Sequence, residues 1–304
     1  MKKENAPYYI SSIQEQHQFW GLPKPKHPLV SVFRIEDTAI QDSSPQHYSF
    51  CYYSIAIKKN FDGKVKYGQG YYDFNSGTMS FVSPNQLLRH DLGDPLPAEG
   101  IILFFHPDFL IGYPLTKTIK DYGFFSYTLS EALHLSEQEE MVIENILKNI
   151  ETEYQSNIDG FSQDVIIAQI ELLLQYCNRF YNRQFITRKP ANHEILIRLE
   201  TILHDYFNGE KLLVSGLPTV LKIAEQLNVS PNYLSDMLRT ITGQTTQQYI
   251  HNKLIEKAKE YLSTTRLTVS EIAYQLGFEH PQSLNKLFKN KTNLSPLEYR
   301  QSFN

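Results

Sequence analysis

Two groups of polar residues near the end of the chain carry the kinds of side chain that can bind base edges in DNA. In chain order they are Asn232, Ser235, Asp236, Arg239, Gln282, Asn285, Lys286 and Lys289. Arginine and lysine pair with guanine, asparagine and glutamine pair with adenine, and a carboxylate accepts a hydrogen bond from cytosine N4. Lysine and arginine also bind phosphates, which position a protein on the duplex. These eight residues are the candidate DNA-binding residues.

Each group fits one face of a short helix. Leu234 and Leu238 have the spacing of buried residues in the first helix, as Leu284 and Phe288 do in the second, which leaves the polar residues on the opposite faces. Asp236 is unusual there because phosphates repel a carboxylate. A single exposed polar residue usually only faces solvent, so the interpretation depends on the two faces occurring together.

The two groups belong to an internal repeat. Ile223-Ala224 recurs as Ile272-Ala273, displaced by 49 residues, and Leu238 matches Phe288, displaced by 50. Self-similarity at a fixed period indicates one structural unit that is used twice.

Both copies carry the signals of two helices joined by a tight turn. In the first copy, Asn228 can end one helix, Ser230 can cap the next and Gly243 can end it. In the second copy, residues 268–271 read as a capping box, and Pro281 can begin the following helix. This is the geometry of the helix-turn-helix, whose second helix enters the major groove. We expect one such motif at about residues 218–242 and another at about 268–292.

A longer helix is expected between the two motifs. Residues 247–262 place Ile250, Leu254, Ala258 and Tyr261 on one face. A helix of about sixteen residues spans ~24 Å, so it could hold two reading helices roughly one DNA turn apart.

The N-terminal half has a different character. Short stretches rich in β-branched and aromatic residues, the composition of strands, lie at 29–35, 48–57, 64–67, 78–82 and 100–105. Turn signals occur at Asp62-Gly63 and Asn75-Ser-Gly77. Many short strands separated by turns favour a small barrel or sandwich. Residues 135–154 and 161–181 show helical periodicity instead.

The second of these helices carries an apolar stripe formed by Val165, Ala168, Leu172 and Tyr176. Such a stripe normally packs against another surface. Two interpretations stay open: the stripe covers its own barrel, or it pairs with the same helix of a second chain. The stretch 183–192 is expected to be a linker.

Composition limits the class of protein. The 304 residues suit two domains, and the net charge is −4. Residues 232–304 nevertheless hold nine lysines and arginines against six acidic residues, which favours site-specific contact over a strong non-specific field. Cys51 and Cys177 form neither a metal pattern nor a disulfide framework, and no secretory signal or membrane helix is evident. We therefore expect a cytoplasmic protein.

Two strings of residues agree in order and spacing with a known family. The first is Ile223-Ala224, Leu227, Val229-Ser-Pro-Asn-Tyr-Leu-Ser235, Gly243 and Tyr249. The second is Val269-Ser-Glu-Ile-Ala-Tyr-Gln-Leu-Gly-Phe278, Ser283-Leu284, Leu287-Phe-Lys289 and Leu294-Ser-Pro-Leu-Glu-Tyr-Arg300. Over about residues 200–302 the chain resembles the AraC/XylS family of transcription regulators.

The resemblance implies a sequence-specific transcription regulator that binds double-stranded promoter DNA and is not an enzyme. The N-terminal half is compatible with the cupin-like sensing domain that this family often carries. A small-molecule effector, RNA polymerase and a second copy of the chain, as a homodimer, are the further partners expected, and no membrane is.

These features predict an α+β multidomain protein. Residues 1–185 would form a small, cupin-like β-barrel for effector sensing and dimerisation, with helices at its C-terminal end. Residues 186–195 would be the linker. Residues 196–304 would form an all-α DNA-binding domain with two helix-turn-helix motifs.

The main alternative is a metal-dependent cupin enzyme with an appended helical bundle. His47, His90 and His106 lie in the strand-rich half, but no His-x-His with a nearby glutamate accompanies them. The sequence also lacks a Gly-x-Ser-x-Gly element and a phosphate-cradling glycine loop. We therefore expect no catalytic residue, metal or cofactor. A third reading is an adaptor whose helices bind protein, and the capped, duplicated reading helices argue against it.

Overall fold

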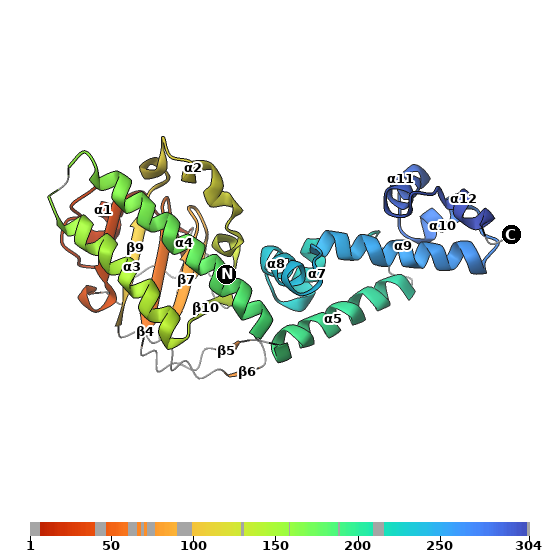
Figure 1. The fold of residues 1–304 in the computed structure, drawn as a ribbon, viewed down its shortest axis with the longest axis horizontal. Coiled ribbons are helices and arrows are strands. Elements are labelled where there is room, and N and C mark those ends of the chain that lie inside the picture. Colours follow the sequence, from red (N-terminus) through yellow and green to blue (C-terminus); the bar gives the residue numbers. More distant parts are fainter. Residues whose placement is uncertain are drawn as a thin grey trace, which may run out of the picture. The chain divides into compact units, whose positions relative to one another are not determined.

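A computed structural model describes residues 7–39, 47–59, 66–67, 70–71, 77–89, 99–128, 131–157, 159–187, 189–208 and 216–302. The chain divides into two compact units, Met1–Gln184 and Phe185–Asn304 (Figure 1). The first unit combines β-sheets with helices, whereas the second is helical. The prediction of a sheet-bearing N-terminal part followed by a helical C-terminal part is therefore confirmed.

Five antiparallel strands form the main sheet of the first unit. In spatial order they are β10 (Leu133–His134), β7 (Thr78–Val82), β4 (Tyr53–Lys59), β9 (Glu99–Phe105) and β2 (Val30–Arg34). The central strands β4 and β9 pair Ile55 with Leu103 and Ile57 with Ile101. Their β-branched and aromatic side chains fit a pleated surface that is buried on both faces.

The remaining strands form smaller sheets. One sheet has the order β1 (Tyr8–Ile10), β3 (His47–Phe50) and β8 (Leu88–Arg89), with β1 and β3 parallel. A two-stranded pair joins β5 (Lys66–Tyr67) to β6 (Gly70–Tyr71). Within the part of the chain that the structure describes, these sheets are separate and none is closed. The predicted turns at Asp62-Gly63 and at Asn75-Ser76 lie outside the described residues.

The chain passes from one sheet to the other at Tyr52, where the sequence predicted a single strand over 48–57. Instead, β3 ends at Phe50 and β4 begins at Tyr53. The Tyr52 ring is fully buried and stacks on Phe50 with centroids 4.5 Å apart, and its hydroxyl donates to Gln16 Oε1 at 2.7 Å. That prediction was wrong because apolar and aromatic residues run through the break without interruption.

An apolar core joins the two larger sheets. It draws residues from β1, β3 and β8 and from β2, β4 and β9. The Phe104 ring lies 4.7 Å from Tyr52, 5.1 Å from Phe33 and 6.1 Å from Phe50, centroid to centroid. Aromatic packing of this kind contributes beyond the area it buries, so this cluster fixes how the two sheets face each other.

Helices cover the other face of the main sheet. The two long ones are α3 (Glu137–Gln155) and α4 (Ser162–Thr187), which lie side by side across the strands (Figure 1). Arg183 of α4 binds Glu139 of α3 at 2.6 Å, and Lys59 of β4 binds Glu140 of α3 at 2.6 Å. The shorter elements of this unit are α1 (Ile13–Phe19), α2 (Leu115–Thr118) and the 3₁₀ turns η1 (Ile35–Asp37), η2 (Pro107–Leu110), η3 (Ile119–Asp121) and η4 (Gly123–Ser126).

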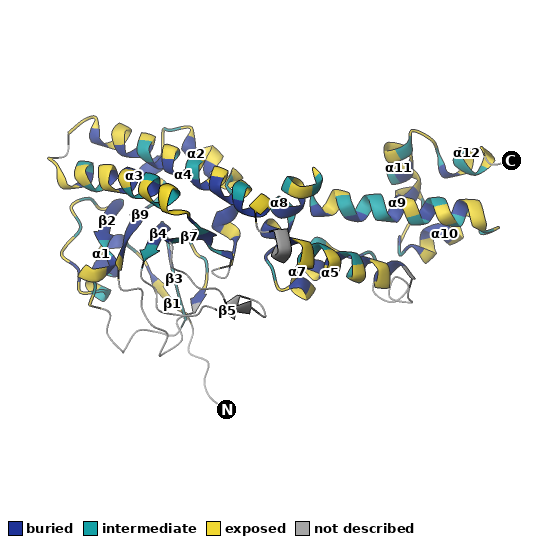
Figure 2. Cartoon of the chain, turned by 60° about the horizontal axis from the view of Figure 1, so that its bottom comes forward, coloured by how far each residue is buried: buried dark blue, intermediate teal, exposed yellow. Residues whose placement is uncertain are grey.

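Most of the predicted apolar stripe of α4 is exposed, whereas Tyr176 is half-buried. The exposed positions of this helix are yellow in Figure 2. Val165 and Leu172 are 43% and 41% exposed, whereas Ile166, Ile170 and Leu173 are buried. The helix therefore packs on its own unit through the neighbouring face. The interpretation that the stripe covers its own barrel is wrong for Val165 and Leu172.

Seven helices are described in the second unit. They are α5 (Lys189–Asn208), α7 (Val220–Leu227), α8 (Pro231–Thr242), α9 (Thr246–Thr264), α10 (Val269–Gln275), α11 (Pro281–Thr292) and α12 (Pro296–Gln301). Residues 186–195, predicted as a linker, include the end of α4 and the first turns of α5. Helical structure extends into this stretch although Pro190 occurs there, because proline is accepted in the first turn of a helix.

None of the helices in the described part of the chain has the length and apolar composition needed to span a membrane.

Gly100 in β9 tests the close pairing of the main sheet. A Cβ at this position would lie 2.1 Å from the Ile57 carbonyl oxygen and 2.8 Å from Ile35 Cδ1. We expect Gly100→Ala to lower the free energy of unfolding by about 3 kcal/mol or more, since overpacking a tight site displaces backbone. Urea unfolding measures the change. Gly160→Ala is the control, because a Cβ there meets nothing within 4 Å. An equal loss of unfolding free energy in both variants would contradict the close packing proposed at Gly100.

Candidate nucleic-acid interface

The first helix-turn-helix consists of α7 and α8. Asn228 adopts a left-handed conformation (φ 56°) at the end of α7, as predicted, and Ser230 Oγ accepts the Tyr233 N–H at 3.2 Å to cap α8. Pro231 occupies the first turn of α8, and Gly243 (φ 75°) ends the helix. The turn between the helices is closed by a hydrogen bond from Val229 N to Ala224 O at 3.0 Å.

The second helix-turn-helix, α10 and α11, repeats this geometry. Thr268 and Glu271 form the predicted capping box at the start of α10. Phe278 N donates to Ala273 O at 3.0 Å, the counterpart of the closing bond in the first motif. Pro281 lies in the first turn of α11, and Asn293 (φ 61°) ends it. The two motifs thus share backbone geometry as well as sequence pattern.

Burial separates the two faces of each reading helix as the sequence predicted. Leu234, Leu238, Leu284 and Phe288 are all 0% exposed. The side chains proposed to meet DNA are either exposed or half-buried. The exposed ones are Asn232, Arg239, Gln282, Asn285, Lys286 and Lys289, and the half-buried ones are Ser235 and Asp236. All eight therefore reach solvent in the described structure.

Helix α9 connects the two motifs. Its 19 residues give a length of about 28 Å at 1.5 Å per residue. The first motif packs at one end of α9, and α10–α12 pack at the other (Figure 1). Ile250, Leu254 and Ala258 are buried, as predicted, and Leu262 continues this face while Tyr261 is half-buried.

Helix α5 braces this arrangement, a role that its sequence did not reveal. Glu200 accepts a hydrogen bond from the Tyr249 hydroxyl and binds Lys253 Nζ at 3.2 Å, which joins α5 to α9. Arg198 donates to the Gln226 carbonyl near the end of α7 at 3.1 Å. Burial, and then the hydrogen bond to Glu200, raises the pKa of Tyr249, so its hydroxyl stays a donor. An amphipathic pattern predicts such a helix but not its partners.

The electrostatic character of the two reading helices differs. On α8, Arg239 Nη1 lies 2.9 Å from Asp236 Oδ1. On α11, Lys286, Lys289 and Lys291 are exposed, and no ion pair of theirs occurs among the described residues. The lysines of the second reading helix are therefore among the exposed positive charges of this unit that have no ion pair within the described residues.

The charge of Arg300 would suit a phosphate contact, but its position in the structure indicates another role. Its Nε donates to the Leu262 carbonyl oxygen at 3.1 Å, close to the end of α9. The guanidinium group thus ties α12 to α9, satisfying one of the carbonyl groups that a helix end leaves without an intrahelical partner. Sequence spacing could not show this contact, because it joins residues 38 positions apart.

Comparisons with known proteins agree with this geometry. A family model described as a helix-turn-helix domain matches residues 223–302. The transcriptional activator RhaS of Escherichia coli O1:K1 is 24% identical over 271 residues, 88% of this chain and 91% of that protein. Histidine kinase P4 of Formosa agariphila is 26% identical over 118 residues, 39% of this chain, which spans only 8% of that protein's length. The C-terminal domain of AraT, a response regulator from Geobacillus stearothermophilus, is 31% identical with a TM-score of 0.32, covering 36% of this chain and 84% of that domain.

Two helix-turn-helix motifs on a common helix, together with the matching family model and the similarity to RhaS, identify a DNA-binding transcription regulator. The family model over residues 223–302 and the similarity to RhaS support the resemblance to the AraC/XylS family.

The capping boxes give this unit a specific response to acid. Hydrogen bonds from Thr268 lower the pKa of Glu271, and hydrogen bonds from Ser295 lower the pKa of Glu298. A carboxyl with a lowered folded-state pKa stabilises the fold above its unfolded-state pKa, and that contribution disappears as pH falls through the folded-state value. We expect the double variant Glu271→Gln, Glu298→Gln to lose less stability than the natural protein between about pH 5 and pH 3.

Urea unfolding followed by helical circular dichroism at a series of pH values measures this difference. Glu279→Gln, exposed and outside both capping boxes, is the matched control. Identical pH profiles for the double variant and the natural protein would show that the two caps do not contribute.

Proposed function

We propose that the chain is a sequence-specific promoter-binding regulator in which α8 and α11 enter neighbouring major grooves. One observation carries the proposal: the apolar faces of both helices are buried at the same helix, α9, so both polar faces stay in solvent. A separation close to one helical turn of DNA, about 34 Å, is what paired reading helices require. The length of α9 is of that order.

The eight exposed or half-buried residues divide by chemistry. Asn232, Gln282 and Asn285 have amide groups suited to adenine, and Arg239 has a guanidinium group suited to guanine. Ser235 can bond to a base or a phosphate, and Asp236 can accept from cytosine. Lys286 and Lys289 suit guanine or phosphates.

The N-terminal unit is the proposed site of control. We infer that its two larger sheets are parts of a cupin-like barrel that senses a small molecule or another signal. Signal binding would act by favouring one arrangement of domains or subunits over another, which requires different affinities for the two. Since the RhaS relatives that match most of the chain are named transcriptional activators, activation through RNA polymerase is the proposed outcome. The enzyme alternative finds no support in these relatives.

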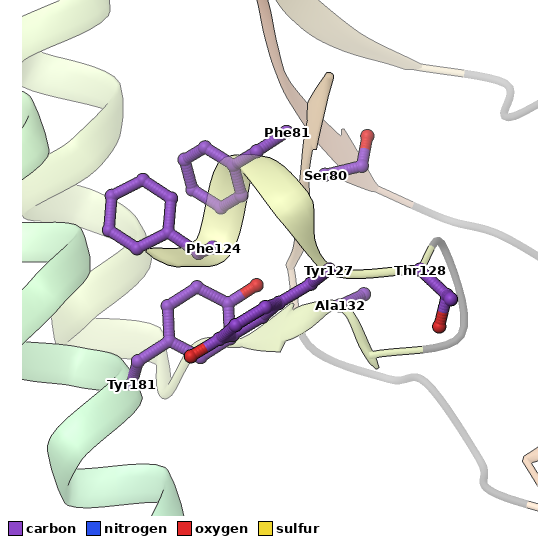
Figure 3. A pocket seen from close by; sticks show the side chains of 7 residues that line it. All are labelled: Ser80, Phe81, Phe124, Tyr127, Thr128, Ala132 and Tyr181. Carbon is purple, nitrogen blue, oxygen red and sulfur yellow. The ribbon is translucent and has the colours of Figure 1, made fainter. Parts of the chain in front are cut away.

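The N-terminal unit contains a small aromatic pocket (Figure 3). It is lined by Ser80, Phe81, Phe124, Tyr127, Thr128, Ala132 and Tyr181. Its cavity volume is only about 10 Å³, far below the 300–1,000 Å³ typical of ligand sites. A metabolite could enter only by displacing rings such as Phe124 and Tyr181, which stack with centroids 5.4 Å apart. In this conformation the pocket therefore has room for about one water molecule.

The exposed stripe of α4 is the proposed dimer surface. Phe161 is 73% exposed, and Val165, Leu172 and the half-buried Tyr176 follow it at helical spacing. A second copy of the same helix is the partner that this stripe fits best, because a two-fold axis brings identical apolar patches together.

Selection of duplexes by the purified protein tests the main proposal. Genomic fragments retained by the full chain are sequenced, and a recurring motif with two half-sites about one helical turn apart is the expected result. Retention that depends only on fragment length would contradict sequence-specific reading.

Lys286 is expected to contribute to binding mainly through charge. Lys286→Ala should weaken binding to a selected duplex and reduce the slope of log affinity against log salt concentration by about 0.9, the amount expected for one lost phosphate contact. Titrations between about 50 and 200 mM salt give the slope. Lys120→Ala, an exposed lysine of the first unit, removes the same charge and should leave the slope unchanged. An unaltered slope in Lys286→Ala discards the phosphate role.

The dimer surface is tested by charge insertion. We expect Val165→Glu with Leu172→Glu to convert a dimer to a monomer, because two carboxylates would then be buried in the apolar seam without partners. Sedimentation of the full chain measures the mass. Asn145→Glu with Asn149→Glu, on exposed positions of α3, provides the control. A natural chain that sediments as a monomer at high concentration rules out the seam.

A further inference from the structure

The exposed face of α8 carries an ion pair where DNA would approach. Asp236 and Arg239 are three residues apart, and Arg239 Nη1 donates to Asp236 Oδ1 at 2.9 Å. Arg239 keeps 59% of its side chain exposed, whereas Asp236 keeps 27%. The carboxylate thus lies closer to the helix and the guanidinium group farther out.

The geometry of a guanidinium group makes this arrangement useful. Arginine presents five N–H donors in a planar fork, and Asp236 engages the Nη1 end. Nη2 has no bond to another described residue, so it remains available to a base. Two donors of one arginine bind guanine O6 and N7 together only when the plane of the fork is aligned with the base pair. A carboxylate that restrains the fork before binding reduces the side-chain entropy lost on binding.

Asp236 also affects phosphate binding, in the opposite direction. Its negative charge cancels that of Arg239, so α8 presents little net charge to a duplex. Helix α11, in contrast, presents Lys286, Lys289 and Lys291 without an ion pair among the described residues. Non-specific affinity rises with the number of cations that meet phosphates, so the two reading helices are unequal in this respect.

We propose that Asp236 is a positioning residue that holds Arg239 for a guanine, so that the first helix-turn-helix supplies base discrimination while the lysines of the second supply phosphate affinity. This inference rests on the proposed function, since it assumes that α8 reads bases. It gives the unusual carboxylate at position 236 a role in specificity.

The test measures specific and non-specific binding separately. The probes are a 30-base-pair duplex library with a randomised centre, and one duplex selected from it by the natural protein. Variants Asp236→Asn, Asp236→Glu, Arg239→Ala and Lys286→Ala are compared in the full chain. Affinity is measured for the selected duplex, for its single-base substitutions and for an unrelated duplex.

We expect Arg239→Ala to reduce the preference for guanine at one base pair by about tenfold or more, the range of one bidentate contact. Asp236→Asn should reduce the preference at that same base pair, while its affinity for the unrelated duplex rises and its salt slope becomes steeper by up to about 1. Asp236→Glu retains the carboxylate and should restore most of the preference. Lys286→Ala should weaken all duplexes alike.

Opposite changes in specific and non-specific binding are the informative result, because a local loss of structure would weaken both. If Asp236→Asn leaves the guanine preference intact, or lowers affinity for every duplex equally, the positioning role is overturned. If the natural protein selects no sequence from the library, the proposed function itself fails. That outcome differs from the one in which the protein selects a sequence but Asp236→Asn leaves its guanine preference unchanged.

Discussion

The burial of four side chains against the helical core constrains everything else in the DNA-binding unit. Leu234, Leu238, Leu284 and Phe288 are completely buried, and removing such side chains from water contributes about 1.5–3 kcal/mol each. Because each of them lies on the face of α8 or α11 opposite the polar residues, their burial leaves no choice about which side chains reach solvent. The proposed reading surface is therefore a consequence of core packing.

The two motifs can hold the same geometry because their turns are set locally. Asn228 adopts the left-handed conformation after α7, and Gly277 has a positive φ (78°) after α10. Each turn is then closed by an N–H that reaches back five residues, from Val229 and from Phe278. Asparagine and glycine tolerate this conformation where other residues are strained. Helix α9, which α5 braces, then fixes the distance between the two helix-turn-helix motifs.

These local signals explain which parts of the structure the sequence could predict. Caps, turns and buried spacings depend on residues within about five positions of one another, so Asn228, Ser230, Gly243 and the capping box at Thr268 could be placed from sequence. The change of sheet at Tyr52, the bond from Arg300 to Leu262 and the bond from Tyr249 to Glu200 depend on distant partners. Periodicity shows that one face of a helix is apolar or charged, but it does not show which distant residues that face contacts.

A chain with a negative net charge can still be a selective regulator, and the charge distribution indicates how. Phosphate contacts favour every duplex equally, so adding cations raises affinity for the many competing sites as much as for the right one. The chain has a net charge of −4, and its first reading helix neutralises its own arginine with Asp236. Under the proposed function, such a protein would depend on base contacts and on the pairing of two half-sites for its occupancy. The small number of unpaired cations on the reading helices would then favour discrimination, because it keeps non-specific binding weak.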